Sequence, residues 1–101
     1  MERNDKVPDY LQDIYTILKC AFPNGINEDE YWSVLSILHQ IMSFWTIADV
    51  LSILANKNRS EVYNDASGFG SDAPPNTEDV ERVKSKLDFC GYEEWVNKND
   101  I

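Results

Sequence analysis

The stretch that decides the fold spans residues 27–42 and reads NEDEYWSVLSILHQIM. Its first residues, Asn27-Glu28-Asp29-Glu30, have the spacing of a capping box, in which the Asn27 side chain accepts from an early N–H group and Glu30 reaches back. The three carboxylates also complement the helix dipole. Apolar residues then recur at three- and four-residue steps, which predicts one broad buried stripe: Tyr31, Val34, Leu35, Leu38, Ile41 and Met42.

The segment before this helix predicts another, capped by Asp9 and running to Phe22. Its apolar residues have the same helical spacing: Leu11, Ile14, Tyr15, Leu18 and Phe22. Pro23-Asn24-Gly25 ends it, because a proline disfavours helical geometry at the residue before it.

Two shorter helices are expected after the central one. Thr46-Ile47-Ala48-Asp49 repeats the capping-box spacing, and the face that follows includes Val50, Leu51 and Leu54. Asn56 to Arg59 is expected to be a loop, after which Ser60 would cap one or two turns reaching Tyr63.

The composition then changes between residues 67 and 75, where Gly, Ser and Pro concentrate as in a connection without regular structure. Asn76-Thr77-Glu78-Asp79 opens a last long helix, and Gly91 is its expected end. Residues 92–96 are expected to add one turn.

No segment has the strict alternation of a strand, so the sequence predicts an all-α fold. We expect a compact bundle of about four to five helices, with one Gly/Ser/Pro-rich loop before the last long helix. The 101 residues are expected to form one domain, 1–101, with flexible ends at 1–8 and 97–101.

The net charge, the N-terminal sequence and the cysteine content limit the binding partners and the cellular compartment that we expect. The net charge of −9 argues against direct nucleic-acid binding, and no apolar run is long enough to cross a membrane. The polar N-terminus has no signal-peptide pattern, so the expected localisation is cytoplasmic. Geometry allows a Cys20–Cys90 bridge, but a reducing compartment favours free thiols, with Cys20 semi-buried and inert.

Catalytic chemistry has little support in the sequence. His39 has no second His or Cys at helical spacing, so it predicts no metal site. Two of the three carboxylate clusters are explained by helix capping, and Gly68-Phe69-Gly70 lacks the other residues of a phosphate loop. We therefore expect no enzyme, no catalytic residue, no cofactor and no metal.

The aromatic residues are more informative, because three tryptophans and five tyrosines exceed what a small core must contain. Aromatic anchors supply much of the binding energy at protein interfaces. Trp32 lies off the apolar stripe and is the preferred interface candidate, Trp45 at a helix junction is expected in the core, and Trp95 is left open between the two. The alternative role of these aromatic residues is structural, in which they cover the ends of a small core. The candidate interaction surface thus comprises Trp32, Trp45, Trp95 and Tyr92.

Two stretches resemble a known family. Residues 21–26 (AFPNGI), followed by Glu30-Tyr31 and the leucines at 35 and 38, resemble the aromatic-Pro-x-Gly-apolar turn and the Tyr-plus-leucine helix of a small helical family of unknown function, best known from mycobacteria. Residues 79–83 (DVERV), with Leu87 and Gly91-Tyr92, resemble its closing helix.

The likeness extends roughly from Tyr10 to Tyr92, with departures at Asn27, where proline is common, at Trp32, which is bulkier, and at Tyr92, where tryptophan is commoner. It implies a bacterial protein with an all-helical fold and supplies no catalytic residue.

The function expected from the sequence is a non-enzymatic protein-interaction module that binds an unknown protein partner or a second copy of itself. The alternatives are a helix-turn-helix-like regulator and an acidic nucleic-acid mimic, with a small enzyme as the weakest reading. Against the regulator, residues 47–55 contain no Lys or Arg to meet a phosphate backbone.

Overall fold

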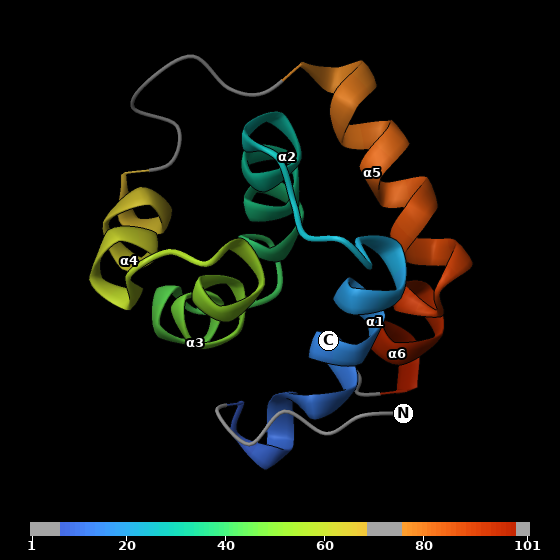
Figure 1. Cartoon of the computed structure of the whole chain (residues 1–101). Coiled ribbons are helices and arrows are strands. Elements are labelled where there is room, and N and C mark those ends of the chain that lie inside the picture. Colours follow the sequence, from blue (N-terminus) through green and yellow to red (C-terminus); the bar gives the residue numbers. More distant parts are fainter. Residues whose placement is uncertain (1–6, 69–75, 99–101) are drawn as a thin grey trace.

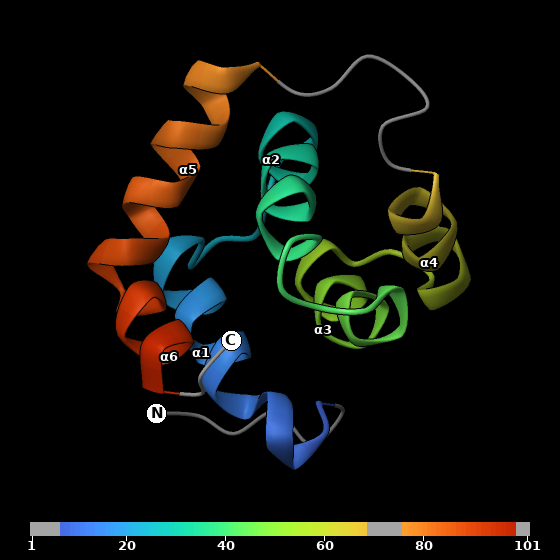
Figure 2. The ribbon, with the colours of Figure 1, turned by 180° about the vertical axis from the view of Figure 1, so that it is seen from behind.

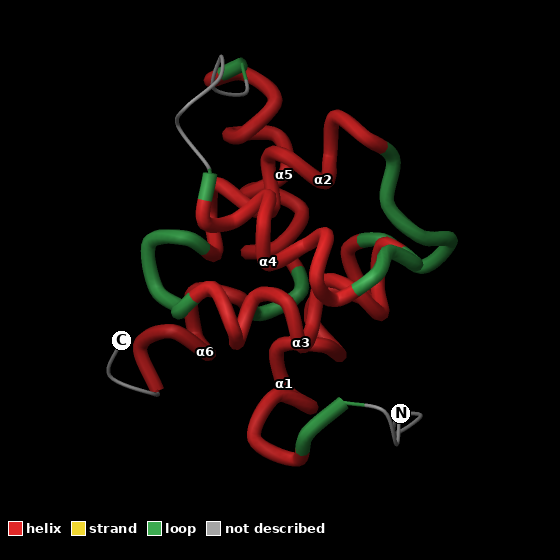
Figure 3. The backbone as a smooth tube through the Cα atoms, turned by 90° about the vertical axis from the view of Figure 1, so that its left-hand side faces the viewer, coloured by secondary structure: helices red, strands yellow, loops and turns green. Residues whose placement is uncertain are grey.

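The second α-helix lies at the centre of the fold in the computed structural model, which describes residues 7–68 and 76–98 (Figure 1). A short 3-10 helix and six α-helices occur in the described residues, and no strand occurs there (Figure 3). In chain order they are η1 (Asp9–Leu11), α1 (Gln12–Ala21), α2 (Glu28–Leu38), α3 (Phe44–Ala55), α4 (Arg59–Ser67), α5 (Thr77–Phe89) and α6 (Tyr92–Lys98).

The all-α prediction is confirmed, but the predicted count of four to five helices was too low. The turn or two expected after Ser60 is a complete helix, α4, and the turn expected after Gly91 is a separate helix, α6. Gly91 divides α5 from α6 because its φ of 96° lies in the left-handed region that favours glycine.

The capping box of α2 is confirmed in both directions. The backbone N–H of Glu30 donates to Asn27 Oδ1 at 2.8 Å, and the backbone N–H of Asn27 donates to Glu30 Oε1 at 3.1 Å. The helix ends at Leu38, sooner than the apolar stripe suggested, because the chain turns through residues 39–43. Ile41 and Met42 therefore pack against the core from this turn.

Three predicted caps were wrong. Ser43, rather than Thr46, caps α3, since its hydroxyl accepts the backbone N–H of Thr46 at 3.3 Å and Phe44 is already helical. Asn58, rather than Ser60, caps α4, where the Asn58 side chain accepts the backbone N–H of Ser60 at 3.0 Å. Asp9 does not cap the first helix, because it is itself the first residue of the 3-10 helix η1, which has no side-chain cap. The predicted start of the last long helix is confirmed, and Asn76 caps it, with the backbone N–H of Glu78 donating to Asn76 Oδ1 at 2.8 Å.

The other helices surround α2. In Figure 1 and from behind in Figure 2, α3 and α4 lie on one side of α2, and α5 lies on the other, with α1 and α6 below. The core includes eight large aliphatic side chains of the first three α-helices that have no exposed surface: Ile14, Leu18, Val34, Leu35, Leu38, Ile47, Val50 and Leu51. The Cα radius of gyration of 12.5 Å is that of a single folded domain of this length, about 13 Å.

The expected loop and ends fall largely outside the described residues. Residues 69–75, most of the Gly/Ser/Pro-rich loop, are not described, and neither are 1–6 and 99–101. Within the segments expected to be flexible, Val7 is only 3% exposed and its carbonyl accepts the Gln12 side-chain amide at 2.7 Å. Lys98 is the last residue of α6.

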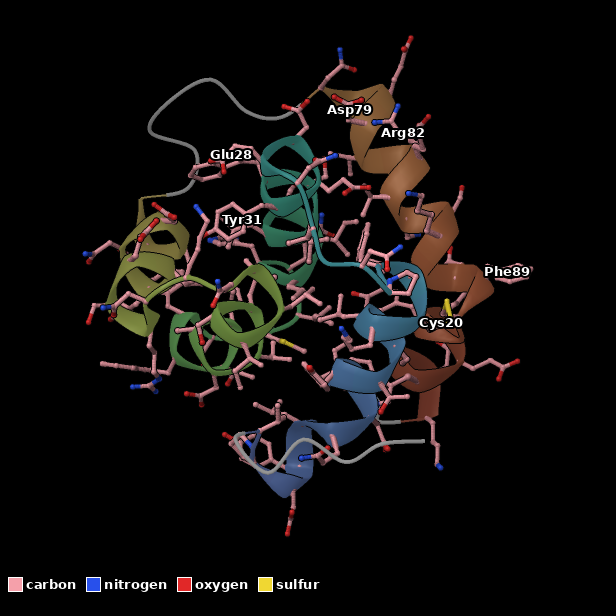
Figure 4. The ribbon with its side chains drawn as sticks, viewed as in Figure 1. Cys20, Glu28, Tyr31, Asp79, Arg82 and Phe89 are labelled. Carbon is pink, nitrogen blue, oxygen red and sulfur yellow. A yellow bond between two sulfur atoms is a disulfide. The ribbon has the colours of Figure 1, made fainter. Side chains whose placement is uncertain are left out.

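A disulfide joins Cys20 at the end of α1 to Cys90 at the end of α5, with a Cα–Cα distance of 5.9 Å (Figure 4). The expectation of free thiols was therefore wrong, as was that of a semi-buried Cys20, which is exposed. The packing of α1 against α5 brings together two cysteines that are 70 residues apart in the sequence.

Removing the disulfide tests how much it stabilises the fold. A bridge that closes a loop of 70 residues restricts the unfolded chain strongly, so the Cys20→Ser/Cys90→Ser variant should lose about 4 kcal/mol of unfolding free energy. Urea titration measures this loss. The wild-type chain in reductant is the control and should fall to the same value. A double variant as stable as the oxidised wild type would contradict the prediction.

Candidate interaction surface

Trp45 is the most informative exposed side chain of α3. It is 57% exposed, although the sequence analysis placed it in the core. The reason is helical phase, because the buried face of α3 comprises Ile47, Ala48, Val50, Leu51 and Leu54. Trp45 and Asp49 are four residues apart and therefore share the outward face. The carboxylate at this spacing was a signal in the sequence that Trp45 faces away from the core.

The neighbouring helix α4 supports the indole. The ring centroids of Trp45 and Tyr63 are 4.3 Å apart, and the Arg59 guanidinium carbon lies 5.1 Å from the indole centroid. Arg59 is itself held in place, since its Nε donates to Asp49 Oδ1 at 2.6 Å. Arg59 and Tyr63 lie one turn apart on α4, so α4 presents both to the same side of α3.

Phe44 extends the aromatic group toward the turn after α2. Its ring meets Tyr63 edge-on at 6.0 Å and an interplanar angle of 87°, and lies 5.6 Å from the His39 ring. Edge-on and offset pairs of this kind are the favourable aromatic arrangements. We call Phe44, Trp45, Arg59 and Tyr63 the α3–α4 aromatic surface.

A polar contact from α2 fixes the position of α4. The Tyr31 hydroxyl donates to Asp65 Oδ2 at 2.6 Å, and the Lys57 ammonium lies 4.3 Å from the Tyr31 ring centroid. Figure 4 shows Tyr31 between α2 and α4. Lys57 also pairs with Glu61 at 3.3 Å and with Glu28 at 3.6 Å. These contacts tie the two ends of α4 to α2.

The environment of Tyr31 keeps its hydroxyl protonated. Burial raises the pKa of Tyr31 well above its usual value, and the hydrogen bond to Asp65 raises it further, since both disfavour a phenolate. The Tyr31 hydroxyl therefore remains a hydrogen-bond donor throughout the physiological pH range.

The other residues expected at the interaction surface do not join this group. Trp32 is half-buried, meets Tyr31 edge-on at 5.2 Å and donates from Nε1 to Glu28 Oε1 at 3.2 Å. Tyr92 is only 5% exposed, so it belongs to the core rather than the surface. Trp95 is half-buried, with its ring centroid 6.2 Å from that of Tyr92. Tyr63 and Arg59 were not among the expected surface residues, because Arg59 was expected in a loop and Tyr63 at the end of one or two turns, whereas both belong to α4.

Within residues 7–68 and 76–98, no group of three or more His, Cys, Asp or Glu side chains is arranged to hold a metal ion. In the same ranges, no helix is both long and apolar enough to cross a membrane.

Comparison with known proteins adds no relative. The chain matches no protein-family model, no curated protein and no solved structure. The class defined by the fold is thus a small all-helical domain, and the mycobacterial resemblance stays a prediction.

Removing the Tyr31 hydroxyl tests the contact that positions α4. Tyr31→Phe deletes the donor to Asp65 and should lower the free energy of unfolding by about 1–2 kcal/mol, measured by urea titration. Tyr10→Phe removes a hydroxyl from a ring that is 69% exposed and should change stability little. Equal stability of the Tyr31 and Tyr10 variants would show that the hydrogen bond does not hold α4.

Proposed function

We propose that this chain is a non-enzymatic protein-interaction module that binds a partner protein, or a second copy of itself, through the α3–α4 aromatic surface. The observation that carries the proposal is Trp45, a large aromatic side chain that is 57% exposed and is in contact with Tyr63 and Arg59 of α4.

The chemistry of this surface suits an interface anchor. Tryptophan, tyrosine and arginine are the residue types enriched at binding hot spots. The rings of Trp45 and Tyr63 are already packed together, so less side-chain entropy is lost when a partner covers them. The Asp49–Arg59 ion pair gives the aromatic centre a polar edge, as in the rim of many interfaces.

The regulator that would read DNA has weaker support. α3 contains no Lys or Arg, and its one carboxylate, Asp49, already binds Arg59. A recognition helix without cations gains little from the phosphate backbone. The acidic-mimic alternative has no specific contact in its favour.

The disulfide indicates the kind of compartment in which the chain would function. The sequence suggested a reducing cytoplasm, in which disulfides are rarely maintained. Because Cys20 and Cys90 are bonded, and Cys20 is exposed to reductants, we infer that an oxidising setting suits the chain better than the cytoplasm.

The test compares two exposed aromatic residues. Trp45→Ala should weaken association by about 30-fold, which corresponds to about 2 kcal/mol at a hot spot, with unchanged helicity because the ring is outside the core. Phe89→Ala removes a ring that is 92% exposed on α5 and is the control (Figure 4).

Self-association is measured by analytical ultracentrifugation, and partner capture from a native extract of the source cells, both without reductant. The wild type and the Phe89 variant should associate equally. The proposal would be contradicted if the Trp45 variant associates as strongly as the wild type, or if both variants lose the same amount of affinity. It would also be contradicted if the wild type does not associate at all. Salt-sensitive retention on duplex DNA would favour the regulator instead.

A further inference from the structure

A groove with a volume of about 450 Å³ lies between the end of α2, α5 and α6, on elements separate from the α3–α4 aromatic surface. Its apolar lining comes from all three: Ile37, Ile41, Val80, Tyr92 and Val96. This volume falls within the range of about 300–1,000 Å³ that is typical of small-molecule sites.

Asp88 of α5 is the polar residue that distinguishes the groove. Its Oδ1 atom is closed off from solvent and has no hydrogen-bond partner in the described structure. Such atoms are unusual, because a buried charged oxygen loses its hydrogen bonds to water, and here no hydrogen bond within the protein replaces them. The carboxylate therefore lacks an internal counter-charge.

The neighbouring charges do not supply one. Lys84 lines the groove one turn before Asp88, but no ion pair joins them among the described residues, whereas Lys86 is paired with Glu30 at 3.2 Å. Glu93 adds a second carboxylate to the lining. The lining therefore has a negative excess beside an apolar wall.

The pKa of Tyr92 is affected by burial and also by the negative charge of Asp88. Burial raises the pKa of its hydroxyl to about 12, and the negative charge of Asp88 contributes to the rise. The Tyr92 side chain that lines the groove is thus neutral at physiological pH and does not compensate the negative charge of Asp88.

We propose that this groove binds a small amphipathic cation, an organic amine whose apolar chain lies against Ile37, Ile41 and Val96 and whose ammonium group faces Asp88. Oδ1 itself has no exposed surface, but the carboxylate charge is shared by both oxygens, so the ammonium group would pair with Oδ2. A charge-assisted hydrogen bond to Oδ2 would give the carboxylate the counter-charge that it lacks inside the protein. This site is independent of the interaction function proposed above.

The test uses n-octylammonium as the probe, with octan-1-ol and octanoate as neutral and anionic probes of matched chain length. Isothermal titration and amide chemical-shift mapping of the oxidised chain measure binding. We expect saturable binding of n-octylammonium, with shifts gathered at residues 37–41, α5 and α6, and weaker binding of both comparison probes.

Two variants on α5 make the test specific. Asp88→Asn keeps the shape and removes the charge, and it should weaken n-octylammonium binding at least about tenfold. Glu81→Gln makes the same change of charge at an exposed position outside the groove and should leave binding unchanged. Circular dichroism confirms that both variants fold. The proposal is overturned if n-octylammonium at millimolar concentration does not bind, or if octan-1-ol or octanoate binds as tightly as n-octylammonium. It is also overturned if the chemical-shift changes map to other residues, or if the Asp88 and Glu81 variants bind n-octylammonium with equal affinity.

Discussion

The burial of α2 on both of its sides is the constraint on which the rest of the structure depends. Val34, Leu35 and Leu38 have no exposed surface, and Tyr31 has only 1%. A helix that loses water around most of its circumference needs neighbours on more than one face. α5 packs against one side, and α3 lies on the other with α4 packed on it, so the chain closes around α2 although residues 69–75 separate α4 from the described start of α5 (Figure 1).

This arrangement gives the two flanks of α2 different surfaces. On the α4 flank, Tyr31 extends from the core to Asp65, and α4 in turn holds Trp45 outward through Arg59 and Tyr63. On the other flank, the short α6 meets α5 beyond Gly91 and leaves the groove beside Asp88. Each surface lies where a shorter helix packs against a longer one, α4 against α3 and α6 against α5.

Local chemistry made much of the fold predictable. The Asn27 and Asn76 caps and the Gly91 break depend on neighbouring residues alone, and all three are present. Ser43 and Thr46 are competing caps of the same chemistry, and packing of Phe44 against the core accompanies the earlier start. The disulfide and the unpartnered Asp88 oxygen depend on contacts between distant segments, which the spacing of residues does not reveal. The exposure of Trp45 was within reach of the sequence, because Asp49 shares its face of α3.

Native-state hydrogen exchange of the oxidised chain tests the central position of α2 most directly. Amides in the buried part of α2, from Val34 to Leu38, should be the slowest to exchange and should open only with global unfolding, because both flanks must separate to expose them. Amides of α4 and α6 should exchange faster through local opening. Exchange from α2 as fast as from α4 would contradict the account, since the two flanks would then be stable without the helix between them.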